Sequence, residues 1–119
     1  MMTTAAAEAF AHEWIEAWNS HDLDRILAHY DDDLTFYSPF IPLLKFNEEG
    51  VIRSKTELAA YFRVGLDTYP DLFFAYRHCF VGVHSLVLYY VSVNGRLAAE
   101  VFELNEHGRA TRVLCHYAS

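Results

Sequence analysis

Apolar residues in the first part of the chain recur at helical spacing. Between residues 5 and 18 they fall at i, i+4, i+5 and i+8, which predicts an amphipathic helix. The residues on this apolar face are Phe10, Trp14, Ile15 and Trp18. Asp22 stands where an N-cap would begin a short second helix, whose apolar face is Leu23, Ile26, Leu27 and Tyr30. Ser54 and Glu57 have the spacing of a capping box and predict a third helix that ends near Thr68.

Most of the remaining chain has the apolar, alternating pattern that is typical of strands. Strands are predicted over residues 34–38, 72–81, 85–93, 97–104 and 109–117. Asp31-Asp32-Asp33 is predicted to form a solvated turn before the first strand. Asn94-Gly95 predicts a hairpin turn, because both residues accept a positive φ. Residues 40–53 show no pattern beyond a short strand around Val51-Ile52.

The predicted helices lie mostly in the first part of the chain and the predicted antiparallel strands in the second. This order predicts an α+β domain, with the helices on one face of a strongly bent sheet. The 119 residues contain no repeat, linker or low-complexity tract, so residues 1–119 are predicted to form one domain. Apolar residues make up 53% of the chain and aromatic residues 16%, which excludes disorder and indicates a large buried volume.

Charge and cysteine content narrow the range of partners and compartments. The net charge is −7 and the basic residues are scattered among acidic ones, so we expect neither nucleic acid nor an anionic membrane as a partner. Cys79 and Cys115 lie in strand-like stretches and are expected to be buried, reduced thiols. The chain shows no signal peptide and no membrane-spanning run, so a cytoplasmic protein is expected.

Three segments in this order resemble the bacterial ketosteroid isomerases of the NTF2-like superfamily, of which the SnoaL-type cyclases are relatives. The segments are His12–Pro39, Ser54–Arg63 and Glu103–Arg109. The resemblance implies a cone-shaped barrel in which three N-terminal helices pack on a strongly curved, mostly antiparallel sheet around an apolar pocket. It also implies a homodimer through the outer sheet face, and strands 85–93 and 109–117 are apolar on both faces.

The resemblance places three catalytic positions of the isomerases on this chain. The position of the general base is Ser38, whose hydroxyl cannot abstract a carbon-bound proton without a partner base. The position of the oxyanion-binding tyrosine is Trp14, which can only donate one hydrogen bond. Only the acid is kept, as Glu100. Steroid isomerisation by the family mechanism is therefore not expected.

Glu100 is the predicted centre of the site. Strand alternation puts it on one face with Ala98 and Phe102, and the resemblance implies that this face is the concave one. Burial there would raise the pKa of the carboxyl group and favour its neutral form. If the strand were turned over, Glu100 would instead be a solvated surface acid.

Alternation and the resemblance supply further candidates for the pocket wall. Besides Trp14 and Glu100, the predicted ligand-binding residues are Tyr30, Phe36, Ser38, Phe62, Tyr89, Phe102, Cys115 and Tyr117. Together they predict an apolar chamber with a few hydroxyl groups, suited to a small hydrophobic or aromatic molecule. Seven histidines show no metal-binding spacing, so neither a metal nor a cofactor is expected.

Two functions remain open from the sequence. One is an enzyme of the isomerase, cyclase or dehydratase type, in which Glu100 is the acid and base and hydroxyl groups orient the substrate. The other is a non-catalytic protein that binds a small molecule and has lost the catalytic residues of the family.

Overall fold

The computed structural model describes residues 1–118, in which four α-helices and six β-strands are present. They follow one another as α1 (Thr4–Ser20), α2 (Leu23–Leu27), β1 (Tyr30–Tyr37), α3 (Phe40–Leu43), β2 (Val51–Ile52), α4 (Lys55–Thr68), β3 (Ala75–Val81), β4 (Ser85–Val91), β5 (Leu97–Leu104) and β6 (Ala110–Tyr117). The predicted α+β class is confirmed. The one-turn helix α3 was not predicted and lies in the segment that lacked a clear sequence pattern.

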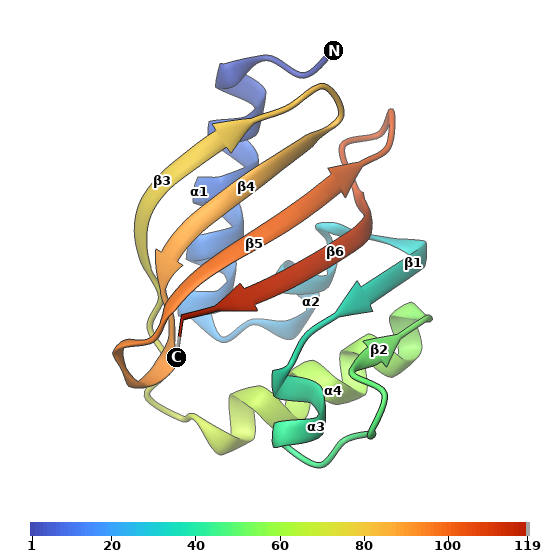
Figure 1. The fold of residues 1–119 in the computed structure, drawn as a ribbon, viewed down its shortest axis with the longest axis vertical. Coiled ribbons are helices and arrows are strands. Elements are labelled where there is room, and N and C mark those ends of the chain that lie inside the picture. The colour runs from blue at the N-terminus through green and yellow to red at the C-terminus, as the bar shows by residue number, and fades with distance from the viewer. Residues whose placement is uncertain (119) are drawn as a thin grey trace.

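The six strands form one mixed sheet in the order β2-β1-β6-β5-β4-β3. The β1–β6 pair is parallel and every other pair is antiparallel, as expected for a mostly antiparallel sheet. Figure 1 shows α1 and α2 on one face of this sheet and α4 near its β1–β2 end. The helix-covered face carries the core, whereas helices leave the other face uncovered within the described residues.

Side-chain caps fix where the helices begin. The Asp22 side chain accepts a hydrogen bond from the Arg25 N–H at 3.2 Å, and Ser54 Oγ accepts one from the Glu57 N–H at 3.1 Å. Both caps were predicted and both are confirmed. Helix α1 begins after Thr3, whose Oγ1 accepts from the Ala6 N–H at 3.0 Å, and ends at His21 with a φ of 61°.

The sequence-based prediction that Tyr30 belongs to the second helix and that Asp31–Asp33 form a turn was wrong. Tyr30 does not extend the second helix but begins β1, and Asp31–Asp33 continue that strand instead of forming a turn. The pairing with β6 is irregular here, because Tyr30 pairs with Ala110 while Thr35 pairs with Arg112. This irregularity places the aspartate side chains in solvent within a strand, and Asp32 is 97% exposed.

The turn between β4 and β5 sets which side chains face the core. Asn94 and Gly95 both have positive φ, as predicted, but the loop contains three residues, because the Ser92 N–H donates to the Arg96 carbonyl at 2.7 Å. Leu88 therefore lies opposite Glu100, and Tyr90 lies opposite Ala98. A two-residue turn would shift this register by one position and exchange the two faces of β4.

Both cysteines are buried and unpaired, as predicted. Cys79 lies on β3 and Cys115 on β6, and two other strands separate them, so they are too far apart for a disulfide. Within residues 1–118, no helix combines the length and the apolar character that crossing a bilayer requires.

Two glycines provide a matched test of the backbone. A Cβ atom at Gly95 or Gly65 would meet nothing within 4 Å, but Gly95 has a φ of +69° while Gly65 is inside α4. We expect Gly95→Ala to lower the free energy of unfolding by about 1 kcal/mol, and Gly65→Ala to raise it by about as much. Urea denaturation followed by circular dichroism measures both. Changes of the same sign would contradict the assigned conformations.

Candidate functional site

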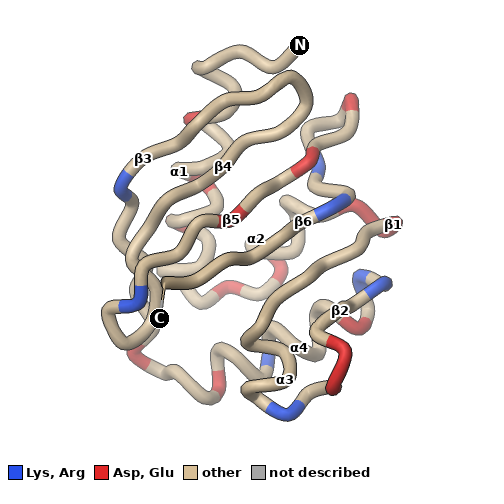
Figure 2. The backbone as a smooth tube through the Cα atoms, in the orientation of Figure 1, with Lys and Arg blue, Asp and Glu red and all other residues tan. Residues whose placement is uncertain are grey.

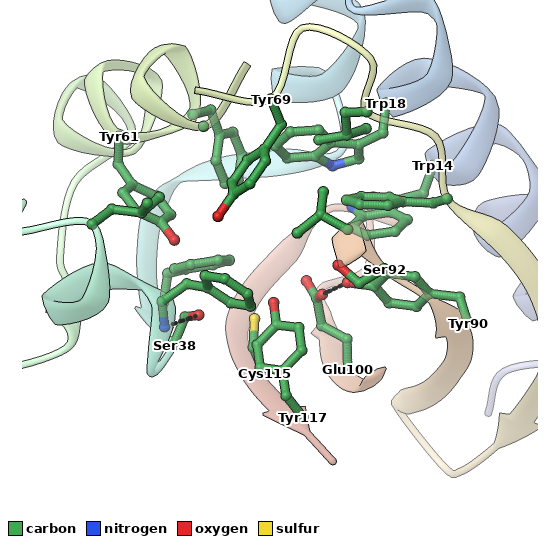
Figure 3. Close-up of a pocket in the computed structure, with 18 of the residues that line it drawn as sticks. Trp14, Trp18, Ser38, Tyr61, Tyr69, Tyr90, Ser92, Glu100, Cys115 and Tyr117 are labelled. Carbon is green, nitrogen blue, oxygen red and sulfur yellow. Dashed lines mark hydrogen bonds between the residues drawn. The ribbon is translucent and has the colours of Figure 1, made fainter. Parts of the chain in front are cut away.

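A cavity lies between the helix-covered face of the sheet, α1 and α4 (Figure 3). The space that protein atoms leave unfilled here is about 530 Å³, and part of it is open to solvent. Its wall is mostly aromatic. Rings come from α1 (Trp14 and Trp18), from β1 (Tyr30 and Phe36) and from α4 (Tyr61 and Phe62). Such a lining, in which aromatic rings alternate with hydroxyl groups and one carboxyl group, suits a small and mostly apolar ligand.

The structure brings together eight of the ten residues that the sequence singled out. The residues in the cavity wall are Trp14, Tyr30, Phe36, Ser38, Phe62, Glu100, Cys115 and Tyr117. They come from α1, α4, β5, β6 and the strand β1 with the residue that follows it. Their proposed roles toward a ligand remain predictions.

Tyr89 and Phe102 do not line the cavity, which corrects their placement. Tyr89 lies opposite Ala99 and faces outward, because the three-residue turn sets a register in which Tyr90 occupies the inner face. Phe102 does share the inner face with Glu100, but it packs against Phe10 and Trp14, with ring centroids 5.2 and 5.4 Å apart. It therefore fills the core two residues beyond the cavity.

Glu100 is a buried carboxyl group in the cavity wall. Its side chain is held between Leu88 and Cys115 on the neighbouring strands, and the residue is only 3% exposed. Its Oε1 accepts a hydrogen bond from the Tyr90 hydroxyl at 2.7 Å, and Figure 3 shows the carboxyl group pointing into the cavity. The predicted inward orientation is confirmed.

Burial raises the pKa of Glu100 from 4.5 to about 7. The hydrogen bond from Tyr90 and an interaction with the Cys115 thiol partly offset this rise, because both favour the ionised form. The carboxyl group is therefore close to half-protonated at neutral pH. That state allows it both to give and to accept a proton.

The indole N–H of Trp14, a residue of the cavity wall, is engaged by another residue of the wall. Its Nε1–H donates to the Tyr30 hydroxyl oxygen at 2.9 Å, and its ring stacks on Phe74 at 5.6 Å. Burial holds the pKa of Tyr30 well above its ordinary value, and Trp14 and Trp18 partly oppose this rise. Tyr30 thus stays a neutral phenol whose oxygen accepts the hydrogen bond from Trp14.

The nitrogen of Trp18 is the exception among the polar groups of the wall. Among the described residues, Trp18 Nε1 is the one fully buried side-chain nitrogen or oxygen that makes no hydrogen bond of good geometry, although it is near enough to the Tyr30 hydroxyl to lower the pKa of that group. Leaving a buried donor unpaired costs about 1–3 kcal/mol. This indole therefore supplies ring surface to the cavity at a cost to the stability of the fold.

Ser38 occupies the junction between β1 and α3. Its Oγ accepts a hydrogen bond from the Phe40 N–H at 3.2 Å, so its hydroxyl helps to shape the turn at Pro39. Within residues 1–118, no histidine, lysine or arginine lines the cavity. Ser38 therefore has no neighbouring strong base that would make it a nucleophile or base, as the sequence indicated.

Sequence reasoning did not assign six aromatic residues to the cavity wall, which are Trp18, Phe40, Tyr61, Tyr69, Phe74 and Tyr90. Trp18 and Tyr61 lie on the apolar faces of their helices, so periodicity predicted their burial but not the space beside them. Tyr90 was missed because the inner face of β4 was assigned to Tyr89 and the residues that alternate with it, whereas Tyr90 is the buried residue. A three-residue hairpin loop with Gly95 at its end was the signal that could have found it.

The described residues form no metal-binding site, either in the cavity or elsewhere. Within residues 1–118, no group of three or more histidine, cysteine, aspartate or glutamate side chains is placed to hold a metal ion. The chemistry of the cavity wall is therefore that of one carboxyl group, one thiol and several hydroxyl groups.

The raised pKa of Glu100 predicts a pH dependence of stability. Between the ordinary value of 4.5 and about 7, the folded protein binds more protons than the unfolded chain, so the free energy of unfolding falls as pH rises. This contribution should amount to about 3 kcal/mol and be lost by about pH 8. The difference in unfolding free energy between the native protein and Glu100→Gln, measured by urea denaturation, isolates it. A difference that does not change with pH would show that Glu100 is ionised normally.

The comparisons with known proteins agree with this architecture. The family model of the SnoaL-like domain matches residues 11–117. A SnoaL-like protein of unknown function from Burkholderia thailandensis has 41% sequence identity, with 100% of both chains covered and a TM-score of 0.94. Among curated proteins, none matches this sequence.

Two more distant structures share the fold. A proposed isomerase of the SnoaL-like family from Agrobacterium tumefaciens is 13% identical, with 98% of this chain and 100% of that chain covered and a TM-score of 0.77. A proposed ketosteroid isomerase from Kribbella flavida is 15% identical, with coverage of 98% and 80% and a TM-score of 0.74. The family match and the 41% identical structure settle the classification. This chain belongs to the SnoaL-like domain family of the NTF2-like superfamily.

Proposed function

We propose that the cavity binds a small, uncharged and mostly apolar molecule and that Glu100 exchanges a proton with it. The reaction would be of the isomerase, cyclase or dehydratase type and need no cofactor. One observation carries the proposal: a carboxyl group with a pKa of about 7 points into an aromatic cavity. A group that titrates near the working pH is the most effective acid–base catalyst.

The neighbours of Glu100 suit this role. Tyr90 holds one carboxyl oxygen and fixes the orientation of the group. Tyr30, which accepts a hydrogen bond from Trp14, keeps its own proton to donate to an oxygen of the ligand. In this arrangement the ionised Glu100 would remove a proton beside a carbonyl group while Tyr30 stabilises the developing negative charge on the oxygen. The proposed isomerases among the structural neighbours favour the same class of reaction.

A second candidate is a protein that binds such a molecule without transforming it. The hydrogen bonds of Ser38 and Trp14, which stand at two catalytic positions of the isomerases, favour this alternative. Ser38 is tied to the Phe40 backbone and Trp14 is tied to Tyr30, so neither provides a second proton-transfer group. Glu100 would then act only as a hydrogen-bonding group for the ligand.

The proposed partner is a small molecule, and the charge distribution supports this choice over nucleic acid or an anionic membrane. Figure 2 shows the Lys and Arg residues dispersed over separate elements, with Asp and Glu between them. The net charge is −7. A surface that holds a phosphate backbone needs a continuous basic patch, which this dispersion does not provide.

Hydrogen–deuterium exchange distinguishes the two candidates. Acetophenone in D₂O is a suitable probe, because its methyl protons exchange when a base removes one of them beside the carbonyl group. We expect the protein to accelerate this exchange at least about 100-fold, with a rate that rises as Glu100 ionises near pH 7. Proton NMR measures the loss of the methyl signal.

The matched control is a second glutamate on the same strand. Glu100→Gln should reduce exchange to the background rate, whereas Glu103→Gln should not, because Glu103 pairs with Arg112 away from the cavity. Probe binding without accelerated exchange would favour the non-catalytic alternative.

We also propose that the protein forms a homodimer through the outer face of the sheet. Directly paired residues make an apolar row across five strands on that face, which consists of Tyr37, Leu114, Val101, Val87 and Phe80. Phe80 is 53% exposed, and the other four are partly exposed. A second copy of the same chain would cover this row symmetrically.

Sedimentation velocity at micromolar concentration tests the dimer. The chain has a mass of 13.7 kDa, and we expect the particle to have about twice that mass. Val101→Lys places a charge in the centre of the row and should give a monomer, because a buried unpaired charge opposes association. His107→Lys, in an exposed turn, is the control and should remain dimeric. A native monomer would contradict the proposal.

The proposed location is the cytoplasm. Cys79 and Cys115 are both free thiols, which fits a reducing compartment, although their separation across the sheet keeps them from pairing with each other in any compartment. Thiol labelling of protein recovered from the cell, with and without denaturation, tests this proposal. We expect both cysteines to be labelled as free thiols in the denatured protein, whereas oxidised cysteines would indicate an oxidising compartment.

A further inference from the structure

The cavity adjoins an open groove at one end of the sheet. The groove lies between the segment that joins α4 to β3 and the turn that joins β4 to β5, which run side by side in Figure 1. Its unfilled space is about 930 Å³, and part of it is open to solvent. Four residues line both the cavity and the groove, and they are Tyr69, Leu72, Ser92 and Val93. The two spaces therefore meet at these residues.

The groove is present because the strand pairing ends beside it. Ala75 pairs with Val91 in the last step of the β3–β4 ladder, and Val91 pairs with Leu97 in the last step of the β4–β5 ladder. Beyond these pairs, no backbone hydrogen bond of the described chain joins residues 69–74 to residues 92–96. The two sides of the groove can therefore separate further without breaking a backbone hydrogen bond.

The two sides of the groove are restrained differently. The segment after α4 is held by the end of α1, because the Asn19 side chain bonds both the N–H and the carbonyl oxygen of Phe74, at 2.7 and 3.0 Å. His21 Nε2 also lies 2.8 Å from the Leu72 carbonyl oxygen. The turn at residues 92–96 is closed by backbone hydrogen bonds within itself. The turn is therefore the less restrained side.

The residues at the boundary suit the passage of an uncharged molecule. Tyr69 and Val93 are half-buried and come from the two sides of the groove, whereas Leu72 and Ser92 are buried. Figure 3 shows the Tyr69 side chain extending into the cavity. Among the described residues that line the groove, Asp71 is the one charged residue, and none is basic. The groove thus has no group that would attract an anion.

An alternative opening would lie beside Leu44 and Gly65, which also line the cavity and are half-buried. The segment that contains Leu44 is closed by local contacts. The Leu44 N–H donates to the Phe40 carbonyl at 2.8 Å, and the Phe46 ring packs edge-on against Tyr61 at 5.5 Å. The groove does not extend to this side. These contacts favour the groove over the alternative.

We propose that the groove is the entrance through which the ligand reaches Glu100, and that Tyr69 and Val93 determine the size of the molecule that passes. A molecule with a bulky substituent is then rejected at the boundary, before it reaches the carboxyl group. This inference rests on the proposed ligand-binding role of the cavity and adds a route and two specificity-determining residues to it.

Acrylamide quenching of tryptophan fluorescence measures access to the cavity without a ligand or a reaction. The chain has two tryptophans, Trp14 and Trp18, and both are buried in the cavity wall. Acrylamide is small and uncharged, and it quenches an indole only when it comes into close proximity. Val93→Ala should raise the quenching rate constant at least about 2-fold by widening the entrance, and Val93→Phe should lower it. Tyr69→Ala widens the other side and should act like Val93→Ala.

Leu44→Ala is the matched control. Leu44 and Val93 are both partly buried apolar residues that pack against the core, and both line the cavity, but Leu44 lies outside the groove. Leu44→Ala should therefore leave the quenching rate constant unchanged. Circular dichroism establishes that each variant is folded under the conditions of the measurement.

Three results would overturn the proposal. They are an equal increase in Val93→Ala and Leu44→Ala, an increase confined to Leu44→Ala, and no response to any substitution at Val93 or Tyr69. Failure of the proposed function gives a different result. In that case quenching follows the expected pattern, while acetophenone neither binds to the protein nor exchanges its methyl protons above the background rate.

Discussion

The burial of one carboxyl group among aromatic rings is the constraint on which the site depends. Removing Glu100 from water disfavours its charge, and among residues 1–118 two contacts compensate for this, from Tyr90 and from the Cys115 thiol. The group is left balanced between its two protonation states at neutral pH. If the cavity were filled by protein side chains, this balance would have no chemical use. If it were open to bulk water, the balance would not exist.

The same aromatic residues perform two tasks that usually conflict. Trp14 stacks on Phe74 and contacts Tyr90, while Trp18 contacts Phe62 and Phe74, so these rings join α1 to α4 and to the sheet. They also form the wall of the space between those elements. Rigid rings can span such a space because they have few rotatable bonds, so the cavity need not collapse when it is empty. The unpaired Trp18 nitrogen is a local cost of this construction.

Local sequence pattern was sufficient for most of the elements, such as α1 from the spacing of Phe10, Trp14 and Trp18, but not for α3 or for the start of β1. Alternation grouped Glu100 with Ala98 and Phe102, and the resemblance to the ketosteroid isomerases supplied the inward direction of that face. Features that depend on distant parts of the chain could not be read this way. Alternation placed Phe102 on the correct face of β5 but could not show that it packs in the core beside the cavity. The three-residue loop after β4 sets a register in which Tyr90, and not Tyr89, lies on the inner face. Tyr69 lies in no periodic pattern, so only the path of the chain after α4 brings it to the cavity.

The position of β6 has a consequence for how the molecule is assembled. β6 lies between β1 and β5, although residues 38–109 of the chain separate it from β1. Without β6, the sheet would divide into the β1–β2 pair with its helices and the meander of β3, β4 and β5. Closing so long a loop makes this pairing entropically expensive and intrinsically slow. Ser38 and Tyr117 therefore meet only when the two halves of the domain join, so the folding step with the highest contact order also completes the cavity.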